Sequence, residues 1–255
     1  MIGALHRILA LLAAAALGGC ATVADPDPRD PLEGMNRGVY RFNDKVDTWV
    51  ARPVATAYRD YVPGEIRDRV RNFFANIADP MIGVNNVLQG KFEDGFFDLV
   101  RFGFNSTFGL LGLHDIASDM GYEKHNEDFG QTFGRWGAGP GPYLVLPFLG
   151  SSDLRDGLAL PLDYYFDPLG ELRPYHLQYG LWGTRVVALR ADLLDASRIL
   201  EEAALDRYIF QRDAYLQRRR SLIYDGQAPR EREPESRVNP APAPDVGNIS
   251  PGGPS

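Results

Sequence analysis

Apolar residues recur at intervals of three and four along most of the chain, and this spacing predicts amphipathic α-helices. The first stripe of this kind consists of Leu32, Met35, Val39, Phe42, Val46 and Trp49. The second consists of Ile66, Val70, Phe73 and Ile77. After this stripe, Asp79 and Pro80 predict the end of one helix and the start of another that runs through Leu88.

The later part of the chain continues this pattern. One stripe consists of Leu177, Leu181, Thr184, Val187 and Leu194, and another of Leu205, Tyr208, Ile209, Arg212, Tyr215 and Leu216. Stretches in which apolar and polar residues alternate, as in half-buried strands, are nearly absent. No apolar run reaches about 18 residues, so no membrane-spanning helix is predicted. We therefore predict a mainly α fold for one domain over residues 30–225.

The segment 91–111 differs from the other helices because it carries six phenylalanines: Phe92, Phe96, Phe97, Phe102, Phe104 and Phe108. On a helical wheel of about 100° per residue, five of its polar residues crowd into an arc of about 80°, and Glu93 is the one charged residue on the remaining circumference. These residues are Lys91, Asp94, Asp98, Arg101 and Asn105. Two interpretations fit so wide an apolar face: a fully buried core helix, or a helix that lies in one leaflet of a membrane.

The first residues of the chain predict secretion and lipid attachment. Residues 1–19 combine His6 and Arg7, a short apolar run and small residues before Cys20, which is the pattern of a signal peptide. Leu-Gly-Gly-Cys also resembles a bacterial lipobox, which implies cleavage before Cys20 and lipidation of this residue. Ala21 in the next position is typical of lipoproteins sent to the outer membrane. The alternative is an ordinary signal peptide with a cysteine there by chance.

Composition limits the remaining classes. The formal net charge of −7 argues against nucleic acid as a partner, because phosphate contacts need a basic surface. Cys20 is the only cysteine, so one copy can form no disulfide. Residues 20–29 are expected to be a tether, and residues 226–255, with seven prolines, a disordered tail. For the basic run Arg218–Arg220 we favour a solvated helix face over a docking patch.

The sequence contains no recognisable catalytic or cofactor motif. His114, His125 and His176 are not spaced as zinc ligands, and neither a nucleophile elbow nor a phosphate-binding glycine loop occurs. We therefore predict no catalytic residue, no metal site and no cofactor.

Nine segments, in order along the chain, carry a resemblance to one family. They are residues 30–37 (DPLEGMNR), 52–54 (RPV), 58–63 (YRDYVP), 85–90 (NNVLQG), 101–105 (RFGFN), 109–112 (GLLG), 129–134 (FGQTFG), 141–150 (GPYLVLPFLG) and 154–156 (LRD). Together they resemble the MlaA (VacJ) family of outer-membrane lipoproteins. The resemblance covers nearly all of residues 30–225 and leaves the proline-rich tail out.

The resemblance implies a fold and a function. The fold is a ring of amphipathic helices in the inner leaflet of the outer membrane, on its periplasmic face, with a central channel. The function is to remove mislocalised phospholipids from the outer leaflet and to pass them to a periplasmic lipid carrier, MlaC. A trimeric outer-membrane porin is the expected further partner. Two alternatives stay open, a structural envelope lipoprotein and a membrane-anchored lipid-cleaving enzyme.

Within this expectation, individual residues receive roles. Polar candidates for the channel lining are Asn43, Asp98, Arg101 and Asn105. Candidates for contact with the membrane are Phe92, Phe96, Phe97, Phe104 and Phe108. The apolar segment 139–150, interrupted by prolines and glycines, is expected to be an irregular corner against the ring interior or a porin. The alternative for this segment is a buried loop of a soluble core.

Overall fold

The computed structural model describes residues 27–229, apart from the side chain of Ala203. Cys20, the signal peptide and residues 230–255 lie outside this range, so the predictions made for them stay predictions. The described chain is mainly α-helical, as the apolar spacing predicts. None of its helices is long and apolar enough to cross a membrane.

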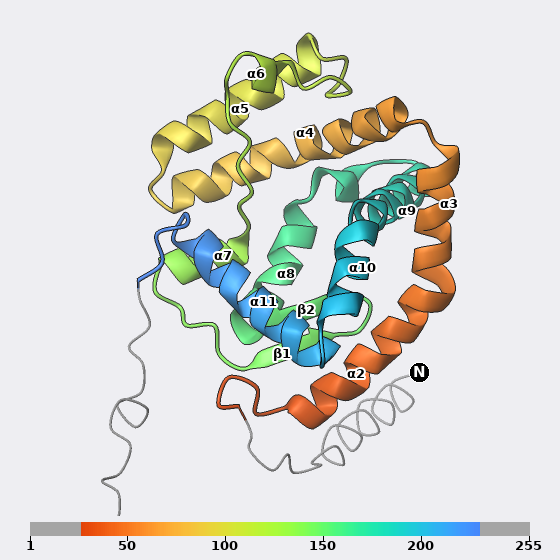
Figure 1. Ribbon diagram of the computed structural model, residues 1–255. Coiled ribbons are helices and arrows are strands. Elements are labelled where there is room, and N and C mark those ends of the chain that lie inside the picture. The colour runs from red at the N-terminus through yellow and green to blue at the C-terminus, as the bar shows by residue number, and fades with distance from the viewer. Residues whose placement is uncertain (1–26, 230–255) are drawn as a thin grey trace, which may run out of the picture.

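The elements follow one another in this order: α2 (Glu33–Val46), the π-helix η1 (Asp47–Ala51), α3 (Arg52–Tyr61), α4 (Gly64–Leu88), α5 (Phe92–Thr107), α6 (Ile116–Asp119), α7 (Phe129–Arg135), β1 (Tyr143–Leu146), β2 (Gly150–Asp153), α8 (Leu154–Phe166), the short 3-10 helix η2 (Pro168–Glu171), α9 (Tyr175–Asp192), α10 (Leu194–Ala203) and α11 (Arg207–Ile223). In Figure 1, α2, α3 and α4 follow an arc, α8 and α10 lie inside it, and α5 runs along the outer side of α4.

The arc begins with α2 and α3, which are joined without a loop. The π-helix η1 links them, and Pro53 sits in the first turn of α3. A π-helical turn is a common cause of a bend in a helix. Arg190 of α9 donates two hydrogen bonds to Asp47, at 2.5 and 2.8 Å, and so ties the bend to the inner helices.

The prediction that one helix ends at Asp79 and Pro80 and another begins there is wrong. Helix α4 is a single helix of 25 residues that continues past Pro80 to Leu88. Packing against α5 accounts for this. A Cβ atom on Gly83 would lie 2.9 Å from the carbonyl oxygen of Gly95, so the two backbones touch and no larger residue fits. Asp79 is buried and bonded to Lys124, which also fixes the turn before the proline. Tertiary contacts of this strength can retain a proline inside a helix despite its lost hydrogen bond.

The expected irregular corner at 139–150 is instead largely a β-hairpin. Strand β1 pairs with β2 in antiparallel register, with Tyr143 opposite Asp153 and Leu146 opposite Gly150. Two asparagines of α2 hold β1. Asn36 donates to the carbonyl of Tyr143 and accepts from Val145 N, while Asn43 donates to the carbonyl of Leu146. The asparagines are seven residues apart, which is two helical turns, so both point at the hairpin.

The interior of the domain is unusually polar. Ten of the twelve largest fully buried side chains are polar or charged: Arg101, Gln131, Asn36, Asn85, Asn86, Thr132, Asp30, Asp79, Asp98 and Asp153. The described apolar clusters are small, one around Ala55, Ala191 and Leu194 and one around Tyr143, Val145 and Tyr208. In water-soluble domains the fully buried side chains are mostly apolar, so this distribution is inverted.

Candidate functional site

Helix α5 shows most clearly that apolar side chains lie outside and polar side chains inside. Phe92, Phe96 and Phe108 are exposed by 69%, 61% and 66%, and Leu99 and Phe102 are exposed as well. Phe97 and Phe104 are half-buried because their rings lie 5.4 and 6.5 Å from that of Tyr122. These phenylalanines are not enclosed by the protein, so the interpretation of α5 as a fully buried core helix is wrong. Contact of its outer face with lipid remains a prediction.

The polar face of α5 packs inward against α4 and the segment 113–125. Arg101 donates to both carboxylate oxygens of Asp115, at 2.9 and 3.0 Å. Asn105 donates to the same carboxylate and accepts from the amide of Ala117. Asp98 accepts from Asn86 at 2.7 Å and lies 2.9 Å from Nδ1 of His125. These hydrogen bonds and ion pairs offset the free-energy cost of burying the charged groups.

This placement bears on the four candidates for a channel lining. Asp98, Arg101 and Asn105 are almost completely buried and hold three segments together. Asn43 binds the hairpin, where its oxygen also accepts from the amide of Phe148 at 2.8 Å. The structure brings the first three together and keeps Asn43 apart from them. That they line a channel stays a prediction, while their contacts give each of them a positioning role.

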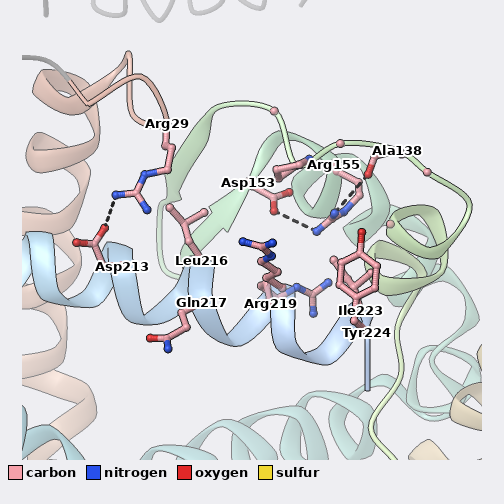
Figure 2. A pocket seen from close by; sticks show the side chains of 16 residues that line it. Arg29, Ala138, Asp153, Arg155, Asp213, Leu216, Gln217, Arg219, Ile223 and Tyr224 are labelled. Carbon is pink, nitrogen blue, oxygen red and sulfur yellow. Dashed lines mark hydrogen bonds and ion pairs between the residues drawn. The ribbon is translucent and has the colours of Figure 1, made fainter. Parts of the chain in front are cut away.

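Two cavities lie near α11 and share one residue, Arg219. The larger has a volume of about 760 Å³ and lies between α7, α11 and the loop 137–141. Figure 2 shows its wall, in which Arg155 donates to Asp153 at 3.2 Å and Arg29 to Asp213 at 3.1 Å. The smaller has a volume of about 280 Å³ and lies between α8, the hairpin and α11. Arg219 is therefore placed to contact a ligand in either cavity.

Carboxylates on two elements hold the guanidinium of Arg219. Its terminal nitrogens donate to Asp128 at 2.6 and 2.9 Å, and its Nε lies 2.5 Å from Oδ2 of Asp156. The sequence of α7 makes room for it. A Cβ atom on Gly130 would lie 2.7 Å from Nη2 of Arg219, and one on Gly134 would lie 3.0 Å from Nη1 of Arg155. The two glycines are one helical turn apart and together admit both arginines.

The charge balance around Arg219 shifts the pKa values of its neighbours in opposite directions. Burial by itself would raise the pKa of Asp128, but hydrogen bonds and the charge of Arg219 outweigh it and the pKa falls. Burial raises the pKa of Asp153 to about 6 and that of Asp163 to about 6. The charge of Arg219 offsets only part of the effect of burial on the pKa of Asp163. The site thus combines carboxylates that are paired with arginines and one carboxyl, Asp163, that forms no ion pair within residues 27–229.

Arg219 and Asp163 were missed by the sequence analysis, which treated the run Arg218–Arg220 as a solvated face. Of the three, Arg218 is exposed, whereas Arg219 is directed into the cavities. The inward direction of Arg219 could have been predicted from the helical spacing of α11. The inward-facing residues of this helix recur every three or four positions, at Tyr208, Arg212, Tyr215, Arg219 and Ile223. The predicted stripe ended at Leu216; continued by one more turn, it would have included Arg219.

These features define a class: a helical protein that directs an apolar helix face outward and encloses a polar interior with cavities. Comparison with known proteins gives the family. The family model described as MlaA lipoprotein matches residues 28–222, and the chain belongs to this family.

Named relatives and a solved structure agree with this assignment. The chain is 37% identical over 238 residues to the intermembrane phospholipid transport system lipoprotein MlaA of Escherichia coli (strain K12), covering 89% of this chain and 94% of the relative. It is 31% identical to the protein of that name in Haemophilus influenzae, over 86% and 90% of the two chains. A solved structure on the structural basis for maintenance of bacterial outer membrane lipid asymmetry matches with a TM-score of 0.67 and 37% identity, over 76% of this chain and 98% of that one.

Proposed function

We propose that this protein is an outer-membrane lipoprotein that removes phospholipids from the outer leaflet and passes them to a periplasmic lipid carrier. The family supports the general role, because its named members belong to an intermembrane phospholipid transport system. The observation that carries the proposal for this chain is the inverted helix α5. Its exposed phenylalanines form a surface suited to acyl chains, while its charges are satisfied inside the protein.

The proposed position is within the inner leaflet of the outer membrane. A helix that lies in a leaflet buries an apolar face among acyl chains, which suits α5, a helix of 16 residues that begins with Phe92 and is followed directly by Phe108. Lipidation at Cys20 would add a second anchor, and two membrane signals together give stable attachment. A trimeric porin and the carrier MlaC are the partners that we propose for this position.

The proposed mechanism is passive. The sequence has no nucleotide-binding motif, so the energy for directed transport must come from other members of the system. Polar surfaces of the interior would shelter a headgroup while the acyl chains remain in an apolar environment. The two cavities beside Arg219 are the candidate polar compartments.

Gene deletion tests this function directly. Cells without the protein should expose more phospholipid on their surface, as measured by an externally added amine-reactive label that does not cross the membrane. Expression of the wild-type chain should restore the low level, and expression of Cys20→Ala should not, because the anchor is lost. If deletion leaves surface phospholipid unchanged under envelope stress, the proposed transport role is wrong and a structural role in the envelope is favoured.

A further inference from the structure

The smaller cavity contains one carboxyl group, that of Asp163, whose charge is not balanced by the part of the chain that the structure describes. Oδ1 of Asp163 accepts a hydrogen bond from the amide of Phe129 at 3.1 Å. The ion pairs formed within residues 27–229 include the neighbouring Asp128 and Asp156 but not Asp163. Asp163 lines the cavity together with the aromatic residue Tyr164, whose ring centroid lies 5.5 Å from that of Trp182. A carboxylate beside an aromatic ring is a suitable environment for an ammonium group, because both attract a cation.

The same cavity also contains a positively charged side chain. Arg219 also lines it, and the guanidinium has five N–H donors. Asp128 accepts one bond from each terminal nitrogen, and Asp156 faces Nε. One N–H on each terminal nitrogen is therefore not used by these carboxylates. The two remaining N–H groups lie on opposite edges of the planar guanidinium, so one of them, not both, can donate to a phosphate oxygen in this cavity.

The rest of the wall and the volume limit what the ligand can be. Leu146, Leu149 and Leu160 contribute apolar surface beside the charged residues. A volume of about 280 Å³ corresponds to roughly nine water molecules at about 30 Å³ each. This is enough for a small headgroup with a phosphate and an amine, but not for two acyl chains. The chains would have to leave along the apolar side.

We propose that the smaller cavity is a headgroup site for zwitterionic glycerophospholipids, in which Arg219 binds the phosphate and Asp163 with Tyr164 binds the ammonium group. This inference rests on the proposed function and adds a lipid class to it. Arg219 pairs with Asp128 and Asp156, and Arg155 is shared between Asp156 and Asp153, so neither arginine is left over for Asp163. The negative charge of Asp163 is therefore not balanced by the residues that the structure describes. An ammonium group neutralises this charge, whereas an anionic headgroup such as phosphoglycerol offers no cation to it. The site should therefore favour phosphoethanolamine lipids.

Lipid competition on the full-length lipidated protein tests the site. The purified protein is equilibrated with nanodiscs that contain equal amounts of phosphatidylethanolamine and phosphatidylglycerol, and the bound lipids are identified by native mass spectrometry. We expect an enrichment of phosphatidylethanolamine of about tenfold, the effect of one charge-assisted contact. N-acetylation of the amine leaves the phosphate and removes the cation, so it should abolish the enrichment without any change to the protein. No enrichment in the wild type overturns the proposal.

Variants place the preference at Asp163. Asp163→Asn keeps the oxygen that accepts from Phe129 and loses the charge, so the enrichment should fall to within about twofold while phosphatidylglycerol still binds. The matched control is Asp195→Asn, an exposed carboxyl paired with Arg59, which should keep the preference. An unchanged preference in Asp163→Asn overturns the assignment. Water-soluble glycerophosphoethanolamine should bind much more weakly than the lipid; equal binding would show a site for soluble headgroups and overturn the lipid assignment.

These outcomes are separate from those of the proposed function. If deletion of the gene raises surface phospholipid but the lipid competition shows no preference, transport stands and the headgroup site is wrong. If deletion has no effect on surface phospholipid, the transport role fails whatever the cavity binds.

Discussion

Replacement of Phe96 by glutamate separates a lipid-facing helix from one that is merely exposed to water. The Phe96 side chain is 61% exposed, so in water the change should alter the free energy of unfolding by no more than about 0.5 kcal/mol. Within a leaflet, a charged side chain costs about 2–3 kcal/mol. At about 1.4 kcal/mol for each factor of ten, this corresponds to about 30- to 150-fold weaker membrane binding.

The assay is the binding of a form without residues 1–20 to phospholipid vesicles, measured by co-sedimentation, because the attached lipid would otherwise dominate the affinity. Phe96→Leu is the matched control, which keeps the apolar character and should bind within about threefold of wild type. Urea unfolding in buffer should give free energies of unfolding within about 0.5 kcal/mol of one another for all three proteins. If Phe96→Glu folds normally and binds vesicles within twofold of wild type, the outer face of α5 does not contact lipid.

Three further predictions concern stability. Arg101→Met should lower the free energy of unfolding by about 3 kcal/mol in urea titrations, because it removes the counter-ion of the partly buried Asp115 and one of the two cations beside the buried Asp79. Arg59→Met, at an exposed pair, should cost less than about 1 kcal/mol. Gly130→Ala should lower the free energy of unfolding by about 1–3 kcal/mol, because its Cβ would lie 2.5 Å from Oδ1 of Asp156. Gly139→Ala is the control, because its Cβ meets nothing within 4 Å. Equal melting temperatures for the two variants would contradict this explanation. Because burial raises the pKa of Asp163 to about 6, the folded state retains a proton that the unfolded chain releases near pH 4, so the free energy of unfolding should fall as pH rises from 4 to 6. Relative to Asp163→Asn, this fall should be about 2 kcal/mol after allowance for the partial exposure of the side chain. Parallel pH profiles for the two proteins would contradict the assignment.

Helical spacing predicted the fold class and the polar stripe of α5, because both depend on local periodicity. Asp98, Arg101 and Asn105 do share one face of the helix, as the wheel required. The sequence could not show what this face contacts. Its partners, Asn86 and Asp115, lie on other elements and become neighbours only through the packing of α4 and α6 on α5. A wheel gives the direction of a side chain but not its surroundings.

Two errors of the sequence analysis have a common cause. Pro80 is a helix breaker by its local chemistry, and α4 passes through it because close packing at Gly83 and the buried Asp79 hold the helix in place. The hairpin was missed because β2 consists of short polar residues without alternation. It forms because β1 is bound by Asn36 and Asn43, which lie about a hundred residues earlier. In both cases distant contacts override a local preference.

Of the two residues Arg219 and Asp163, one could have been predicted from the sequence and the other could not. The direction of Arg219 follows from the period of α11, so the sequence contains it. The absence of a counter-ion at Asp163 does not follow from any spacing, because it depends on which arginines the fold brings to Asp128 and Asp156. Charge balance within a cavity can be judged only from the three-dimensional structure.

Site-specific photo-crosslinking in living cells tests most directly whether the apolar face of α5 lies among lipids. A benzophenone amino acid is placed at Phe96, and at the exposed Arg218 of α11 as the matched control, in the full-length protein. After illumination, the adducts are identified by mass spectrometry. We predict phospholipid adducts at position 96 and none, or far fewer, at position 218. Adducts to protein alone at position 96, or equal lipid adducts at both positions, would contradict the account.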